Sequence, residues 1–182
     1  MLTAKPPMTS TKLIASSSRK VVEVTSLTIR NSTVMPTNSS IDTIAKTCIA
    51  VRLRLLNRVV ANFYDDALRP LGLKVSQLNI LIVTARLGLA RPAQVCEILQ
   101  LDTSTLSRNV KPLQAHGWLE VVPDEDARTQ PFRLTPQGKR LIEKAVPAWE
   151  EAQRQATELL GDEGIALLDK AAKKLRQAKA EG

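Results

Sequence analysis

Apolar side chains recur every three or four residues along most of the chain after residue 40, which is the spacing of an amphipathic helix. The first such stretch has its apolar positions at Ile41, Ile44, Cys48, Val51, Leu55, Val59 and Phe63. Since the sequence RPLG at 69–72 contains both Pro and Gly, we expect the helix to end there. The pattern predicts one long helix over residues 41–68.

Three shorter helices are predicted next, over residues 76–87, 92–99 and 103–116. Pro92 suits the first position of a helix, and Asp102 is a good N-cap because its carboxylate can accept from free backbone N–H groups. Two predicted strands, 118–122 and 132–134, then flank a charged loop and form a hairpin. Two short helices followed by a hairpin make a winged helix-turn-helix, in which the second helix enters the DNA major groove.

The helix predicted over 103–116 has an unusual division of side chains. Leu106, Val110 and Leu113 line one side at helical spacing. The opposite side carries short polar groups and two cations, and we expect these residues to contact DNA: Ser104, Thr105, Ser107, Arg108, Asn109 and Lys111. Short hydroxyls let a helix approach base edges, arginine matches guanine and asparagine matches adenine. An ordinary solvated helix face is the alternative, but no acid stands between Asp102 and Glu120, which favours an anionic partner.

The C-terminal part of the chain again has a helical pattern. Thr135 followed by Pro136 is a typical helix start, and the apolar face continues to about residue 160. Gly161 separates this helix from a last one, and Pro147 is expected to bend it or to be tolerated by a neighbour. The fold class predicted is mainly α with a small β-hairpin.

Charge and composition change this picture only modestly. The net charge is +8, but residues 1–40 hold five Lys and Arg side chains against Glu23 alone, so much of the excess lies on one Ser- and Thr-rich tail. We expect this tail to be disordered. An acid-poor transit peptide and an over-long start, with Met35 as the true initiator, remain alternatives.

The chain offers little for catalysis or metal binding. Two cysteines, Cys48 and Cys96, make no disulfide framework, which fits a reducing cytoplasm. His116 is the single histidine, and there is no Gly-rich phosphate loop, so we expect no metal, no cofactor and no enzymatic activity. The sequence contains no run of about 18 apolar residues, so we expect no membrane-spanning helix.

From about residue 44 to 176 the chain resembles the MarR family of bacterial winged-helix regulators. The matching stretches are ALRPLGLKVSQLNIL, LDTSTLSRNVKPLQAHGWLEVV and DEDARTQPFRLTPQGKRL, and the last is the most specific. The resemblance implies a winged lobe over about 74–135 and a homodimer held by helices 41–68 and 136–178. It also implies that Arg128 enters the DNA minor groove at the wing tip and that Asp126 supports the wing. For Arg128 the alternative is a solvated loop charge.

The same resemblance implies a ligand-responsive repressor of transcription acting on a pseudo-palindromic site in double-stranded DNA. The effector would be a phenolic or other aromatic molecule, and Phe63, Tyr64 and Trp149 are candidates to line its pocket, although core or interface packing is the simpler role. Cysteine oxidation at Cys48 is a further alternative, and so is a winged helix used only for protein interaction. Three residues depart from the family pattern. Two of them stand at helix starts, Lys74 and Arg91, and Ser76 is expected to replace part of the cap that is missing at Lys74. The third is Trp118.

Overall fold

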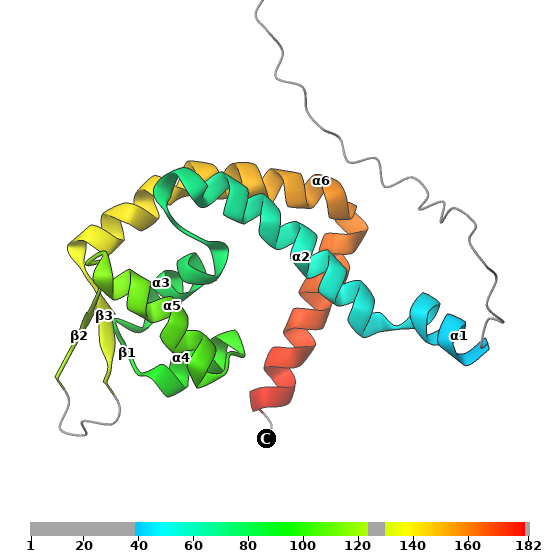
Figure 1. Ribbon diagram of the computed structural model, residues 1–182, viewed down its shortest axis with the longest axis horizontal. Helices are drawn as coiled ribbons and strands as arrows, with labels where there is room; N and C mark the ends of the chain where they lie inside the picture. The colour runs from blue at the N-terminus through cyan, green and yellow to red at the C-terminus, as the bar shows by residue number, and fades with distance from the viewer. Residues whose placement is uncertain (1–38, 124–129, 181–182) are drawn as a thin grey trace, which may run out of the picture. The chain divides into compact units, whose positions relative to one another are not determined.

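The structure, a computed structural model, describes residues 39–123 and 130–180 (Figure 1). The described residues from Ala45 onward form one compact unit, and those up to Ile44 form another. The secondary structure elements are α1 Ser39–Thr47, α2 Ile49–Leu68, the short 3-10 helix η1 Arg69–Leu71, α3 Val75–Leu87, β1 Leu89–Ala90, α4 Pro92–Leu99, α5 Thr103–Ala115, β2 Leu119–Val121, β3 Phe132–Leu134 and α6 Pro136–Ala180. The predicted class, mainly α with a small β part, is confirmed.

The prediction of a single helix over 41–68 was wrong in one respect, because the chain forms two helices there that are separated at Cys48. The backbone there is extended, with φ −62° and ψ 112°, and separates α1 from α2. The guanidinium of Arg52 donates to the carbonyl of Lys46, so a side chain of α2 satisfies a free carbonyl at the end of α1. Periodicity did not reveal this break, since the apolar spacing continues across it.

Helix α2 packs along α6 (Figure 1). The hydroxyl of Tyr64 on α2 donates to the side-chain carbonyl of Gln153 on α6, and partial burial raises the pKa of Tyr64. The predicted break at Gly161 is confirmed by its φ of 65° and ψ of 170°, which lie outside the helical range. Helix α6 continues through Pro147, so the proline does not end it.

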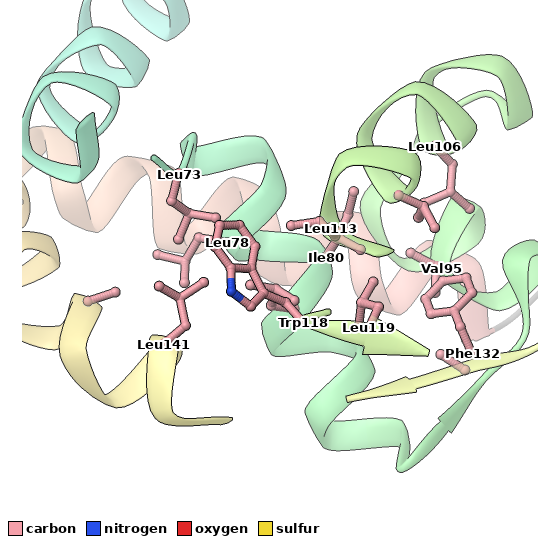
Figure 2. Close-up of a cluster of buried hydrophobic side chains, with 14 of the residues drawn as sticks. Leu73, Leu78, Ile80, Val95, Leu106, Leu113, Trp118, Leu119, Phe132 and Leu141 are labelled. Atoms are coloured by element: carbon pink, nitrogen blue, oxygen red, sulfur yellow. The ribbon is translucent and has the colours of Figure 1, made fainter. Parts of the chain in front are cut away.

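A contiguous hydrophobic core fills the winged lobe. Side chains from the helices and the sheet meet in it, as Figure 2 shows for Leu73, Leu78, Ile80, Val95, Leu106, Leu113, Trp118, Leu119, Phe132 and Leu141. The apolar face of α5 is buried, as its helical spacing predicted: Leu106, Val110 and Leu113 all lie in this core. This core fixes α5 against α3 and α4, and so decides which face of α5 is left outside.

The predicted hairpin is one part of a three-stranded antiparallel sheet in the order β1-β3-β2. Strand β1, just after Gly88, pairs Leu89 with Arg133 and Ala90 with Phe132. Strand β1 was not predicted from the sequence, because two residues are too short for any alternation to be recognised. Its pairing attaches the base of the wing to the end of α3.

The start of α6 lies very close to β2. The hydroxyl of Thr135 donates to the carbonyl of Gly117 (2.6 Å) and accepts from the N–H of Gly138 (3.0 Å). A Cβ on Gly138 would lie 2.2 Å from the Trp118 carbonyl oxygen, closer than any real contact. Thr135 therefore caps α6 and ties it to the end of the α5–β2 turn, and Gly138 permits that approach.

Candidate nucleic-acid interface

Asp102 holds the first turn of α5 in place. Its carboxylate accepts from the Thr105 backbone N–H (2.8 Å), the Thr105 hydroxyl (2.7 Å) and the Ser104 hydroxyl (2.6 Å). These bonds, the one from the Ser104 hydroxyl foremost, hold the pKa of Asp102 well below its usual value. The N-cap predicted from the sequence is confirmed, and it fixes Ser104 and Thr105 as part of the cap.

The outer face of α5 is polar, basic and open. Ser104, Ser107, Arg108 and Lys111 are all exposed. The Arg108 guanidinium has one long contact, 3.4 Å to the Ser104 hydroxyl. Within residues 39–123 and 130–180, neither Arg108 nor Lys111 forms an ion pair, so both cations are available to an external anion.

Asn109 lies differently from the other predicted contact residues. It is half-buried, its side-chain N–H donates to the Thr105 carbonyl (2.9 Å), and its side-chain oxygen accepts from the Ser76 hydroxyl (3.1 Å). Both ends of the amide are thus engaged within the protein. Thr105 is likewise half-buried, with its hydroxyl bound to Asp102. These contacts give Asn109 and Thr105 a part in positioning α5.

Ser76 does not supply the cap of α3 that was predicted from the sequence, because its hydroxyl donates to Asn109 on α5. The cap comes instead from α2, where Asp65 accepts from the Val75 backbone N–H at 2.8 Å. Gln77 adds a second bond by accepting from the Lys74 N–H at 3.0 Å. A carboxylate ten residues upstream has no local signature in the sequence, so only the fold brings it to the helix start.

Helix α5 continues through Pro112, so this proline does not divide it. Both the backbone N–H of His116 (3.0 Å) and its ring Nδ1 (2.7 Å) contact the Pro112 carbonyl. The His116 ring stacks on Trp118, with ring centroids 4.5 Å apart. Gly117 has φ 68°, and the chain turns there into β2. His116 thus reinforces the last turn of a helix that lacks one backbone donor.

An ion pair joins the two strands of the wing. Glu120 on β2 faces Arg133 on β3, and the Arg133 Nε donates to the Glu120 carboxylate at 2.6 Å. Arg133 is solvent-exposed. Arg128 and Asp126 lie outside the described residues, so their predicted roles stay predictions.

An apolar pocket of about 360 Å³ lies between α3 and α6. It is lined by Leu78, Asn79, Ile82, Ile142, Ala145, Val146 and Trp149. Of the three aromatic residues considered for an effector pocket, Trp149 alone lines it; Tyr64 bonds to Gln153 and Phe63 is half-buried on α2.

Neither cysteine is part of a larger reactive group in the described structure. Cys48 is free and half-buried at the break between α1 and α2, and Cys96 packs against the core from α4. Among the described residues, no group of three or more His, Cys, Asp and Glu side chains is arranged to hold a metal ion. None of the helices in those residues combines the length and hydrophobicity that crossing a membrane requires.

Comparison with known proteins agrees with this geometry. The family model for the MarR family matches residues 71–128, which include α3, α4, α5 and β2. Over these residues the chain is similar to the MarR family. The multiple antibiotic resistance protein MarR of Salmonella typhimurium is 27% identical over 124 residues, covering 66% of this chain and 85% of that protein. The transcriptional regulator YwoH of Bacillus subtilis is 26% identical over 87 residues, 48% of this chain and 64% of that one.

Solved MarR-family structures share the fold. A mutant MarR from E. coli complexed with operator DNA matches with a TM-score of 0.64 and 21% identity, over 73% of this chain and 96% of that chain. BpsR of Bordetella bronchiseptica, whose DNA binding is regulated by 6-hydroxynicotinic acid, matches with a TM-score of 0.61 and 20% identity, over 71% and 95%. The winged helix-turn-helix lobe predicted from the sequence is thereby confirmed.

Proposed function

We propose that this chain is a sequence-specific regulator of transcription of the MarR family that binds double-stranded DNA and has no catalytic role. The observation that carries the proposal is the outer face of α5, where Ser104, Ser107, Arg108 and Lys111 are exposed and no acid interrupts them. The E. coli relative solved with operator DNA supports the same use of this fold. A DNA-binding role places the protein in the bacterial cytoplasm.

In this proposal α5 enters the major groove. Arg108 reads a guanine edge, Lys111 contacts phosphate, and the Ser104 and Ser107 hydroxyls contact bases or phosphates. Arg128 at the wing tip reaches the adjacent minor groove, where the narrow groove concentrates negative potential, and Asp126 supports the wing. Asn109 acts through its bonds to Ser76 and Thr105, which hold the helix that carries the reading residues.

The functional unit we propose is a homodimer. Helix α2 has 20 residues and buries only Leu68 within one chain, while Leu53, Leu55 and other apolar side chains stay exposed. The later part of α6 likewise exposes Leu167 and Leu175. A second copy would cover such faces, and a two-fold dimer would recognise a pseudo-palindrome with half-sites about 10 bp apart.

The regulator responds to a ligand and acts as a repressor in this proposal. The apolar pocket lined by Trp149, Ile82 and Ile142 lies between the winged lobe and α6, so an occupant would alter how the lobe is held. Ligand control of a relative, BpsR, supports this proposal.

The test is selection of bound fragments from the source genome, followed by titration of the selected site at two salt concentrations. We expect specific binding that weakens as salt rises, because phosphate contacts release counterions. Arg108→Ala should relax base preference and Arg128→Ala should weaken binding more evenly across sequences. Wild-type affinity in both variants would refute the assignment, with Lys170→Ala on the exposed surface of α6 as the control.

A further inference from the structure

One half-buried acid of α2 reaches the start of α3. Asp65 stands in the last turn of α2, and its carboxylate accepts from the Val75 backbone N–H at 2.8 Å. Val75 is the first residue of α3, and the first N–H groups of a helix have no partner within that helix. A carboxylate at this place also meets the partial positive charge of the helix start. Asp65 therefore holds the first turn of α3 from outside that helix.

The connection between α2 and α3 is tightly built. Leu68 at the end of α2 and Leu73 just before α3 are both buried in the lobe core, where Figure 2 shows Leu73. Between them Gly72 has φ 65°, and its N–H donates to the Arg69 carbonyl at 2.9 Å. Two buried anchors, a tight turn and the Asp65 bond leave this segment little freedom to bend. The last turn of α2 and the first turn of α3 therefore form one block.

The first turn of α3 in turn contacts α5. The Ser76 hydroxyl donates to the side-chain oxygen of Asn109 at 3.1 Å, and Ser76 lies in the turn that Asp65 holds. The side-chain N–H of Asn109 donates to the Thr105 carbonyl at 2.9 Å. The Thr105 hydroxyl donates at 2.7 Å to Asp102, the N-cap of α5. A series of hydrogen bonds thus runs from α2 through the start of α3 to the start of α5.

The same turn of α2 is also tied to α6. Tyr64, the neighbour of Asp65, donates from its hydroxyl to the side chain of Gln153 on α6. Successive residues of a helix point in directions about 100° apart, so one residue reaches α6 and the next reaches α3. Asp66 differs from both, because it is exposed and pairs with Arg69 at the surface. A displacement of the long helices can therefore reach α3 through the last turn of α2.

We propose that Asp65 and Ser76 are positioning residues for α5, through which a displacement of α2 against the winged lobe changes the orientation of the helix that binds DNA. For its effect on DNA binding this inference rests on the proposed function; as a link between α2 and α5 it does not. Contacts to base edges need a fixed helix orientation, whereas a flexible lysine reaches a phosphate after a small shift. Loss of the link therefore lowers specific binding more than non-specific binding.

Titration of variants of the full chain with the selected DNA site and with random DNA tests the link. Asp65→Ala should weaken binding of the selected site about tenfold and Ser76→Ala about fivefold, because a charge-assisted and a neutral hydrogen bond are lost. Affinity for random DNA should change by less than about twofold, since no cation is removed. Asp66→Ala removes the same charge from the next, exposed residue and should match the wild type. Ser76→Thr keeps the hydroxyl and Asp65→Asn keeps an accepting oxygen, so both should recover most of the affinity.

The double variant Asp65→Ala/Ser76→Ala decides whether the two residues act through one link. In a shared link the second change removes nothing further, so the double variant should bind the selected site about as weakly as Asp65→Ala alone. Independent effects would multiply to a loss of about fiftyfold. Such a multiplied loss, or equal affinities of Asp65→Ala and Asp66→Ala, would overturn the proposal.

Hydrogen exchange of backbone amides tests the link without DNA. The Leu106 N–H, which is bonded in the first turn of α5, should exchange about fivefold faster in Asp65→Ala and in Ser76→Ala than in the wild type, relative to the buried Val95 of α4. If Asp65→Ala does not fold, Ser76→Ala, a change at an exposed side chain, carries both tests. Unchanged exchange at Leu106 would refute the link even if DNA affinity fell. Faster exchange in these variants but not in Asp66→Ala, in a chain that selects no DNA, would remove the proposed function and leave the link standing.

Discussion

The winged lobe buries its apolar side chains, whereas the two long helices, α2 and α6, leave many of theirs exposed. In the lobe, Leu81, Leu113 and Leu119 are almost fully buried, and every element contributes to one core. Helix α2 buries only Leu68, and α6 exposes Leu167 and Leu175. Because apolar burial is the main driving force of folding, the lobe is complete within one chain, whereas the long helices leave apolar side chains uncovered, as the proposed dimer would explain.

This difference separates two tasks. In the lobe, α5, the helix proposed to read DNA, is held by its core contacts, by Asp102 and by Ser76. The long helices would set the distance between two such lobes in a dimer. In the proposed function, a ligand between α3 and α6 would lie where the two regions meet, so it could shift that distance without touching DNA.

The largest effect is expected inside the lobe, from Gly138→Ala. The new Cβ would meet the Trp118 carbonyl at 2.2 Å, so either α6 or β2 must move. Overpacking of this kind costs about 3 kcal/mol, to be measured by urea unfolding. Gly164→Ala, whose Cβ would lie 3.2 Å from its nearest neighbour, is the matched control and should change stability by less than about 1 kcal/mol.

The next effect tests whether α2 is covered by a second copy. Leu55→Asp places a charge at a side chain that is 62% exposed in one chain, so a monomer would tolerate it. In a dimer the change should weaken association by roughly 2 kcal/mol, or about 30-fold, as measured by analytical ultracentrifugation. Asn62→Asp adds the same charge to another exposed position of α2 and should dissociate nothing. Equal dimerisation in both variants would remove α2 from the interface.

A third comparison divides the polar residues of α5 into reading and positioning groups. Arg108→Ala should lower specific DNA affinity by about 1–3 kcal/mol and leave unfolding unchanged, because the side chain is exposed. Asn109→Ala should cost about 1 kcal/mol of folding stability, since two internal hydrogen bonds are lost. If Asn109→Ala instead relaxed base preference with normal stability, the sequence-based reading of Asn109 would be restored.

The smallest effect concerns the α5 cap and depends on pH. Hydrogen bonds hold the pKa of Asp102 below its unfolded value, so its contribution is present above the unfolded pKa of about 4 and is lost as pH falls toward the folded pKa. The melting temperature of the wild type should exceed that of Asp102→Ala at neutral pH, with the gap shrinking below about pH 4. Asp169→Ala, on the exposed surface of α6, serves as control and should show no such gap.

Most of the secondary structure was predictable because its causes are local. Helical spacing located α3 to α6, Asp102 and Thr135 marked two helix starts, and Gly161 marked the interruption of α6. The buried and exposed faces of α5 followed from spacing alone, with Leu106 inside and Arg108 outside. Features without a local cause were missed, such as the break at Cys48 and the two-residue strand β1.

The sequence by itself determined the order of the main helices and the hairpin, the winged helix-turn-helix and the acid-free polar face of α5, because periodicity, capping residues and charge are properties of neighbours along the chain. Only the tertiary structure decided which of those polar groups remain available. It turned Asn109 toward Ser76 and brought Asp65 to the start of α3. These pairings join residues far apart in sequence, and such contacts exist only after the core has packed.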